Sequence, residues 1–312
     1  RHVHLPDRVT PAPNPRDRLI AFRRQLGPVP RLTKQHVKVR GLELAVFTSP
    51  PVKGSTPLLC INGGLLFDHT LLWPAVAPLA KRRQLILYDQ RGRGASETPR
   101  DPLAARIEDD AADVASLRIA LGISRWDVLA HSFGAGIAIL GTGRDAEGTR
   151  RVALIDPVGA TSAWRDSLIA AARERLSPGA RAVLDRFDRD TLSRPDPNIH
   201  SSFARTIFPA WFADPRMAEF IPLPRSTSET GAAVYARIWR DGYDWTATLR
   251  AVETPSVVVH GERDLLPRAV AAEVASTMRR ATLASVADAG HMPFLESPEP
   301  FFELVETFFE PP

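Results

Sequence analysis

The sequence predicts an α/β protein with a mostly parallel central sheet, helices on both faces and an inserted helical segment. Apolar runs at residues 56–61, 84–88 and 152–155 are typical of strands that are buried on both faces of a parallel sheet. Segments with helical character alternate with these runs. Between residues 159 and 246 the alternation stops, and only helical patterns occur. The chain therefore divides into a sheet-forming core and an insertion.

Composition supports one large domain with an inserted subdomain. The 312 residues are 44% hydrophobic and 24% charged, which suits a protein with a sizeable core. The single cysteine, Cys60, lies in an apolar run, and we expect it to be inert core. No stretch approaches the roughly 18 apolar residues of a membrane span, and no apolar signal core stands near Arg1. We therefore expect a cytoplasmic protein without a membrane span.

The charge distribution argues against nucleic-acid binding. Forty basic and 36 acidic residues give a formal net charge of +4. All but four of the basic residues are arginines, and they are interspersed with acids rather than gathered in a basic run. We expect a small-molecule substrate as the partner, and the sequence leaves the oligomeric state open.

The first half of the chain reads as an N-terminal extension followed by strands and helices. Residues 1–30 form the extension, with a short helix at 17–26. A hairpin turns at Gly41. The elements expected after the extension are strands 35–40, 42–48 and 56–61, helix 69–80, strand 84–88, helix 107–121, strand 126–131 and helix 135–140.

The second half contains the insertion. We expect an α/β core of residues 31–158 and 247–312, and a helical cap of residues 159–246 that holds most of the large aromatic side chains. Ligand sites favour such boundaries, which predicts an apolar pocket lined by Leu65, Trp211, Phe212, Trp239 and Met292. The expected elements are strand 152–155, helices 163–176, 179–187, 202–212 and 229–239, strand 256–260, helix 269–279, strand 282–286 and a final helix from 297.

One serine stands where a strand gives way to a helix. Ser132 follows the apolar strand 126–131, with Ala130 and Gly134 two residues away on either side. A nucleophile elbow has this spacing, because its serine sits in a strained turn that leaves room only for small neighbours. This stretch resembles the α/β-hydrolase family, which implies that Ser132 is a nucleophile.

The resemblance also implies a histidine base near the end of the chain. His291, in Ala289-Gly290-His291-Met292-Pro293, follows the last strand, where the family places its base. His131 adjoins the serine, but strand alternation predicts that its side chain points away. Two other histidines lie outside the N-terminal tail, the hairpin and the insertion. These are His69 and His260, and neither follows the last strand.

The acid that orients the base has two candidates. Asp264 ends Gly261-Glu262-Arg263-Asp264 after strand 256–260 and fits the family's strand-Gly-x-x-Asp pattern, while Glu262 is two residues off. Asp156 ends strand 152–155 and is the rival, because some relatives carry the acid one strand earlier. The resemblance favours Asp264.

Two backbone N–H groups are the expected oxyanion donors, those of Phe133 and Gly64. Gly64 lies in Asn62-Gly63-Gly64-Leu65, which resembles a His-Gly-Gly oxyanion loop and that of the proline iminopeptidase branch. Asn62 stands where relatives usually carry histidine, and the branch's following proline is absent. The stretch Asp89-Gln90-Arg91-Gly92-Arg93-Gly94-Ala95-Ser96 resembles a structural turn of the family rather than a dinucleotide loop. We expect no cofactor and no metal.

These features together predict a serine hydrolase that cleaves a small, largely apolar ester through an acyl-enzyme intermediate. The resemblance leaves four alternatives open. They are an aminopeptidase of the proline iminopeptidase type, a carbon–carbon bond hydrolase, an acyltransferase, and a non-catalytic ligand-binding protein on the same scaffold.

Overall fold

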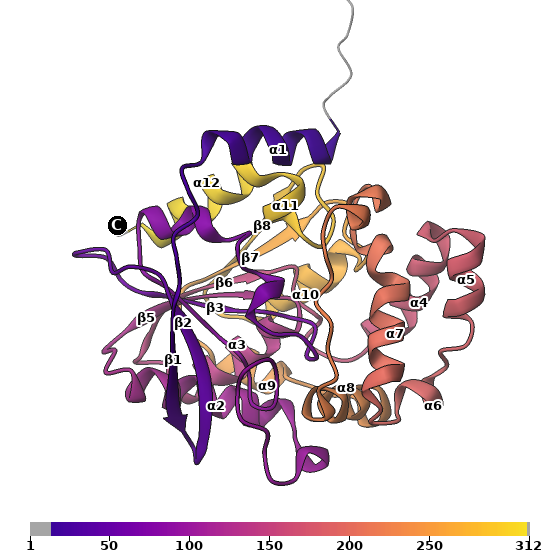
Figure 1. Ribbon diagram of the computed structural model, residues 1–312, viewed down its shortest axis with the longest axis horizontal. Coiled ribbons are helices and arrows are strands. Elements are labelled where there is room, and N and C mark those ends of the chain that lie inside the picture. The colour runs from indigo at the N-terminus through magenta and orange to yellow at the C-terminus, as the bar shows by residue number, and fades with distance from the viewer. Residues whose placement is uncertain (1–13, 311–312) are drawn as a thin grey trace, which may run out of the picture.

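A computed structural model describes residues 14–310, which form an eight-stranded sheet with helices on both faces (Figure 1). The strand order is β1-β2-β4-β3-β5-β6-β7-β8. Strand β2 runs antiparallel to its neighbours β1 and β4, and all other pairs are parallel. The strands are β1 (Thr33–Val39), β2 (Leu42–Thr48), β3 (Leu58–Ile61), β4 (Leu85–Tyr88), β5 (Trp126–His131), β6 (Thr149–Ile155), β7 (Ser256–Gly261) and β8 (Ala281–Val286).

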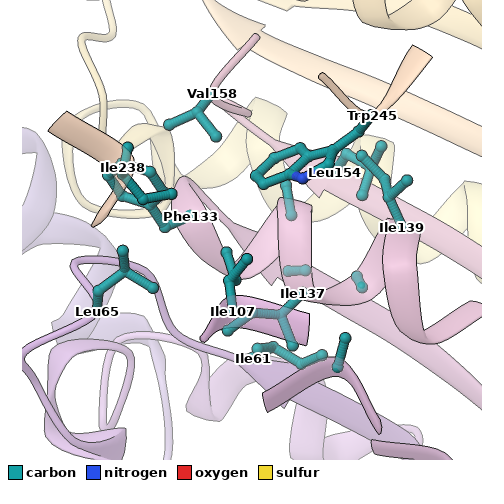
Figure 2. Close-up of a cluster of buried hydrophobic side chains, with 14 of the residues drawn as sticks. Ile61, Leu65, Ile107, Phe133, Ile137, Ile139, Leu154, Val158, Ile238 and Trp245 are labelled. Atoms are coloured by element: carbon teal, nitrogen blue, oxygen red, sulfur yellow. The ribbon is translucent and has the colours of Figure 1, made fainter. Parts of the chain in front are cut away.

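Alternation along the buried strands divides the core into two layers. Leu59 and Ala130 belong to the cluster covered by one set of helices, and their neighbours Cys60 and Leu129 belong to the cluster on the opposite face. Figure 2 shows part of the first cluster, with Ile61 from β3 packed near Ile107 and Ile137 from the helices. The helices of this face are α2 (Ile107–Ala120), α3 (Phe133–Arg144), α9 (Thr246–Ala251) and α10 (Arg268–Thr277).

The opposite face is covered by the two ends of the described chain. Helix α1 (Pro15–Gln25) packs against α11 (Pro293–Glu296) and α12 (Pro298–Phe309), and Phe22 stacks on Phe302 with ring centroids 5.6 Å apart. Cys60 is buried on this face, and burial raises the pKa of its thiol to about 12. The expectation of an inert core cysteine agrees with this environment.

Residues 159–246 lie between β6 and β7 and stand to one side of the sheet (Figure 1). Helix α7 (Pro197–Ile207) ends earlier than the expected 212, because Pro209 has no N–H to continue it. The 3₁₀ helix η4 (Phe208–Trp211) follows. The other elements are α4 (Trp164–Arg175), α5 (Pro178–Leu184), α6 (Arg189–Leu192), η5 (Pro215–Glu219) and α8 (Glu229–Asp241).

The prediction of one continuous helix over residues 69–80 is wrong. Two short 3₁₀ helices, η1 (His69–Leu71) and η2 (Ala77–Lys81), replace it, since Pro74 and Pro78 lack the N–H groups of a continuous α-helix. A third, η3 (Pro102–Ala104), precedes α2. Among the described helices, none combines the length and apolar character needed to cross a bilayer.

Candidate active site

Ser132 stands at the sharp junction between β5 and α3. Its backbone has φ 57° and ψ −122°, a strained conformation for a residue with a side chain. A Cβ at Gly134 would lie 2.5 Å from the Ile61 carbonyl oxygen, so the position two residues after Ser132 accepts no side chain. Backbone strain and a close approach to β3 therefore lift the Ser132 hydroxyl out of the sheet, as the small neighbours predicted.

Ser132 opens into a cavity between the sheet edge and residues 159–246. The space there that is free of protein atoms is about 650 Å³, a figure that includes space open to solvent. The lining of the cavity brings Gly64 and His291, which are far from Ser132 in the sequence, together with Ser132 and Phe133. Within residues 14–310 we find no hydrogen bond to the Ser132 hydroxyl, which leaves its oxygen available to a ligand.

His291 is oriented by Asp264. The imidazole Nδ1 lies 3.0 and 3.1 Å from the two carboxylate oxygens of Asp264, and both residues are buried. Burial acts to raise the pKa of the Asp264 carboxyl, but the charge and hydrogen bond of His291 outweigh it and the pKa is lowered. An ionised Asp264 therefore holds the proton on Nδ1 and leaves Nε2, at the other edge of the ring, for the cavity.

Asp156, the rival acid, is beside this pair but does not contact His291. Its Oδ1 accepts a hydrogen bond of 2.8 Å from the Gly261 N–H. Burial, and then the charge of Asp264, raise the pKa of Asp156 well above its ordinary value. The shift favours the neutral form of Asp156 beside the ionised Asp264, since two adjacent carboxylates do not both ionise. Glu262 is exposed and lies outside the cluster.

Among residues 14–310, two groups of donor atoms could be considered for a metal, and both contain carboxylates bonded to protein donors. Asp156, His260 and Asp264 lie within 4.8 Å of one another, but Asp264 is bonded to His291. In the second group, Asp89 accepts hydrogen bonds from the His69 and Ala95 backbones. These carboxylates are occupied by protein donors, so neither group is arranged as an open ligand set.

The expected oxyanion donors flank Ser132. Gly64 has φ 77°, and Phe133 is the first residue of α3, where backbone N–H groups have no partner within the helix. For neither N–H does the described part of the chain supply an acceptor. Asn62 braces the loop, since its Nδ2 donates to the carbonyls of Gly63 and Phe67 at 3.1 Å.

Comparison with known proteins identifies the family. A model described as "Alpha/beta hydrolase family" matches residues 58–304. The chain belongs to the α/β-hydrolase family. This agrees with the eight-stranded, mostly parallel sheet and with the serine at the β5–α3 turn.

Similar members of the α/β-hydrolase family carry different names. Proline iminopeptidase of Heyndrickxia coagulans is 22% identical over 268 residues, 82% of this chain and 91% of that protein. The 2-hydroxymuconate semialdehyde hydrolase of Pseudomonas sp. (strain CF600) is 30% identical over 261 residues, 81% of this chain and 86% of that protein. The structure of the enol-lactonase from Burkholderia xenovorans LB400 matches with a TM-score of 0.61 and 25% identity, covering 88% of this chain and 99% of that one.

In this α/β-hydrolase the predicted pocket residues divide into two groups. Trp211 and Met292 line the cavity, whereas Leu65, Phe212 and Trp239 do not. The sequence reasoning also missed most of the walls, which are Leu66, Phe67, Leu71, Val158, Trp164, Leu168, Ala204, Ile207, Phe208, Leu223 and Tyr235.

For each predicted residue that does not line the cavity, the structure shows a local cause. Leu65 has φ 49° and turns its side chain into the core, so its neighbour Leu66 faces the cavity. Phe212 follows Trp211 on extended backbone and points the opposite way, to within 5.2 Å of the Phe208 ring. Trp239 lies one turn of α8 beyond the wall and packs against Trp164 and Phe203.

His131 turns its ring to the face covered by α11, as strand alternation predicts, and yet it contacts the site. The loop that carries His291 returns on that same face. The His131 ring lies 4.8 Å from the His291 ring, and its Nε2 is 2.8 Å from the His291 carbonyl oxygen. Since a carbonyl only accepts, Nε2 carries the proton. Burial, and then the charge of His291, lower the pKa of His131 to about 3, so the ring is neutral.

Proposed function

We propose that this α/β-hydrolase is a serine hydrolase that cleaves a small, largely apolar ester through an acyl-enzyme intermediate. The observation that carries the proposal is the shared cavity, in which the Ser132 hydroxyl opens beside an imidazole that is oriented by Asp264. In this proposal residues 159–246 are the cap of the substrate site.

The mechanism assigns one role to each group. His291 Nε2 accepts the Ser132 proton while Oγ attacks the ester carbonyl carbon, and the Gly64 and Phe133 N–H groups stabilise the oxyanion. The tetrahedral intermediate collapses, the C–O bond breaks, and His291 returns the proton to the departing alcohol. Water, deprotonated by His291, then attacks the acyl group, and the carboxylic acid leaves as Ser132 regains its proton.

The character of the cavity supports an apolar ester. Its walls come from aliphatic and aromatic side chains. Apart from Ser132 and the histidines, its polar groups are the hydroxyl of Tyr235 and the indole N–H groups of two tryptophans. Among the described residues that line it, there is no carboxylate to bind a substrate ammonium. Glu219 and Glu229, the acids an aminopeptidase could have used, lie elsewhere. The cavity thus favours an ester over the amino-terminal proline of a peptide.

A second candidate is a carbon–carbon bond hydrolase. It is favoured by the 30% identity to a protein named 2-hydroxymuconate semialdehyde hydrolase. The same serine, base and oxyanion donors would attack a ketone carbonyl in that reaction. An acyltransferase or a non-catalytic receptor has no comparable observation in its favour.

Labelling with a fluorophosphonate probe tests the nucleophile. We expect the purified protein to be labelled, Ser132→Ala to be unlabelled, and Ser202→Ala, a control on an exposed serine of α7, to be labelled as the wild type is. Hydrolysis of p-nitrophenyl butyrate should then exceed that of proline p-nitroanilide. Labelling of Ser132→Ala at the wild-type rate would refute the proposed nucleophile, and faster release of the anilide would refute the ester assignment.

A further inference from the structure

The loop that carries His291 is bound to the segment of residues 210–213, which follows α7 in the insertion. The His291 N–H donates a hydrogen bond of 2.8 Å to the Trp211 carbonyl, and the two rings lie with centroids 4.0 Å apart. Gly290 permits this approach, because a Cβ there would lie 2.4 Å from the Trp211 carbonyl oxygen and 2.6 Å from the Ala213 nitrogen.

One fully buried carboxylate bridges the loop and the segment. Glu296, the last residue of α11, has no exposed surface. Its Oε1 accepts a hydrogen bond of 2.6 Å from the Ala213 N–H, and its Oε2 accepts one of 2.8 Å from the Gly290 N–H. Each oxygen therefore satisfies a buried backbone donor on a different part of the chain, one of them directly before His291.

We propose that Glu296 is a positioning residue, which holds the His291 loop against residues 210–213 and so fixes the imidazole of the base relative to Ser132. The inference rests on the proposed function, since it takes His291 as the base. Glu296 itself touches no reacting atom. It acts through Gly290 on one side and through Ala213, two residues from the Trp211 ring that packs on the imidazole, on the other.

The charges around Glu296 make its protonation state matter. Burial raises its pKa to about 7, although the N–H donors of Ala213 and Gly290 oppose the shift. The charge of Asp264 acts in the same direction as burial, and Glu296 in turn acts on Asp156 and on the Arg175 guanidinium of α4. His291 faces it across Gly290. A proton on either oxygen turns that oxygen into a donor, which opposes the N–H in front of it.

Glu296→Gln is the sharpest variant because it keeps the size of the side chain and presents one acceptor where two are needed. Its matched control is Asp127→Asn. Asp127 is a fully buried carboxylate at the opposite end of β5, paired with Arg83 at 3.1 Å. Both variants disturb a buried acid, but only the first disturbs the His291 loop.

We expect Glu296→Gln to lower kcat for p-nitrophenyl butyrate about tenfold or more at pH 8, and Asp127→Asn to leave kcat within about twofold. Between pH 8 and pH 6 kcat/KM should fall further in the wild type than in Glu296→Gln, because only the wild type has a carboxyl at position 296 that gains a proton in this range. A loss of stability alone would not produce this difference in pH dependence. An unchanged kcat and an unchanged pH dependence in Glu296→Gln would overturn the proposal.

Hydrogen exchange tests, without relying on turnover, whether Glu296 holds the His291 loop against residues 210–213. In Glu296→Gln, amides of residues 209–217 and 287–295 should both exchange faster, while Asp127→Asn leaves them unchanged. In the wild type, the amides of both peptides should also exchange faster at pH 6 than at pH 8, after correction for intrinsic rates. This comparison tests the proposal even if Glu296→Gln does not fold. Unchanged exchange in both peptides would overturn the proposal even if Ser132→Ala abolishes hydrolysis. Faster exchange in a protein that is not labelled by fluorophosphonate would instead place the failure in the proposed function.

Discussion

The imidazole of His131 donates, through Nε2, a hydrogen bond of 2.8 Å to the carbonyl oxygen of His291. The residue before the proposed nucleophile thus holds the backbone of the proposed base. Because the His291 N–H is bonded to Trp211, both backbone groups of His291 are satisfied by residues from distant parts of the chain.

His131→Phe should lower kcat/KM about tenfold, because the aromatic ring fills the space but leaves the buried His291 carbonyl without its donor. Assays with p-nitrophenyl butyrate check this. His36→Phe, on the exposed face of β1, is the control. Wild-type kcat/KM in His131→Phe would show that the hydrogen bond is not needed to place the base.

The same variant predicts a pH dependence of stability. The pKa of His131 in the folded protein, about 3, is below its unfolded value of about 6.5. Its contribution is therefore fully present above pH 6.5 and is lost as the pH falls from there toward 3. Relative to pH 8, the difference in unfolding free energy between wild type and His131→Phe should shrink by about 2 kcal/mol at pH 5. Urea denaturation at the two pH values measures it, and a constant difference would contradict a buried neutral ring.

Asp264→Asn and Asp156→Asn should differ sharply. The first removes the charge that orients His291 and should lower kcat on the order of 10⁴-fold, with the imidazole free to adopt the wrong tautomer. The second replaces an acid that does not contact His291 by an amide of the same shape, whose oxygen can still accept from the Gly261 N–H, and it should change kcat less than about threefold. Steady-state hydrolysis by both variants decides between them. Equal losses would mean that Asp156 shares the role of the acid.

Ala204→Phe should change the chain-length preference of the enzyme. Ala204 lines the cavity from α7, so a phenyl ring there removes space for the longer acyl group. We expect the ratio of kcat/KM for p-nitrophenyl butyrate to that for the acetate to fall about tenfold. Ser202→Phe, on an exposed position of the same helix, should leave the ratio unchanged. An unchanged ratio in Ala204→Phe would mean that acyl groups bind elsewhere.

Gly290→Ala should lower both stability and activity. Its Cβ would collide with the backbone of residues 211–213, so the loop must shift, at a cost of about 1–3 kcal/mol in unfolding free energy and about tenfold or more in kcat/KM. Gly179→Ala is the control. A Cβ at Gly179 meets nothing within 4 Å, and alanine should stabilise α5 by about 0.5–1 kcal/mol. Denaturation and kinetics of the two variants measure these effects.

The sequence predicted the contact between Asp264 and His291 better than it predicted the walls of the cavity. Strand 126–131 has the predicted bounds, and Asp264 and His291, 27 residues apart, are in hydrogen-bond contact. Both results follow from local patterns, because parallel strands bring their carboxyl ends to one edge of the sheet.

The rest depends on contacts that no local pattern records. Glu296 accepts a hydrogen bond from Ala213, 83 residues away, and no sequence pattern near either residue predicts this contact. Leu66 faces the cavity in place of Leu65, because the positive φ of Leu65 changes which of the two side chains points there. Trp239 misses the cavity by one helical turn, a distance that depends on how α8 packs.

The bonds between residues 210–213 and the His291 loop limit how this scaffold can be re-engineered. A designer who grafts the insertion of a relative onto this core, to import its selectivity, would also replace the acceptor at Trp211 and the donor at Ala213. A chimaera built with crossover points at residues 159 and 246 would therefore inherit a foreign pocket together with a loosened imidazole. Crossovers that leave 210–213 native, and exchange the helices on either side, should preserve turnover while altering what is bound.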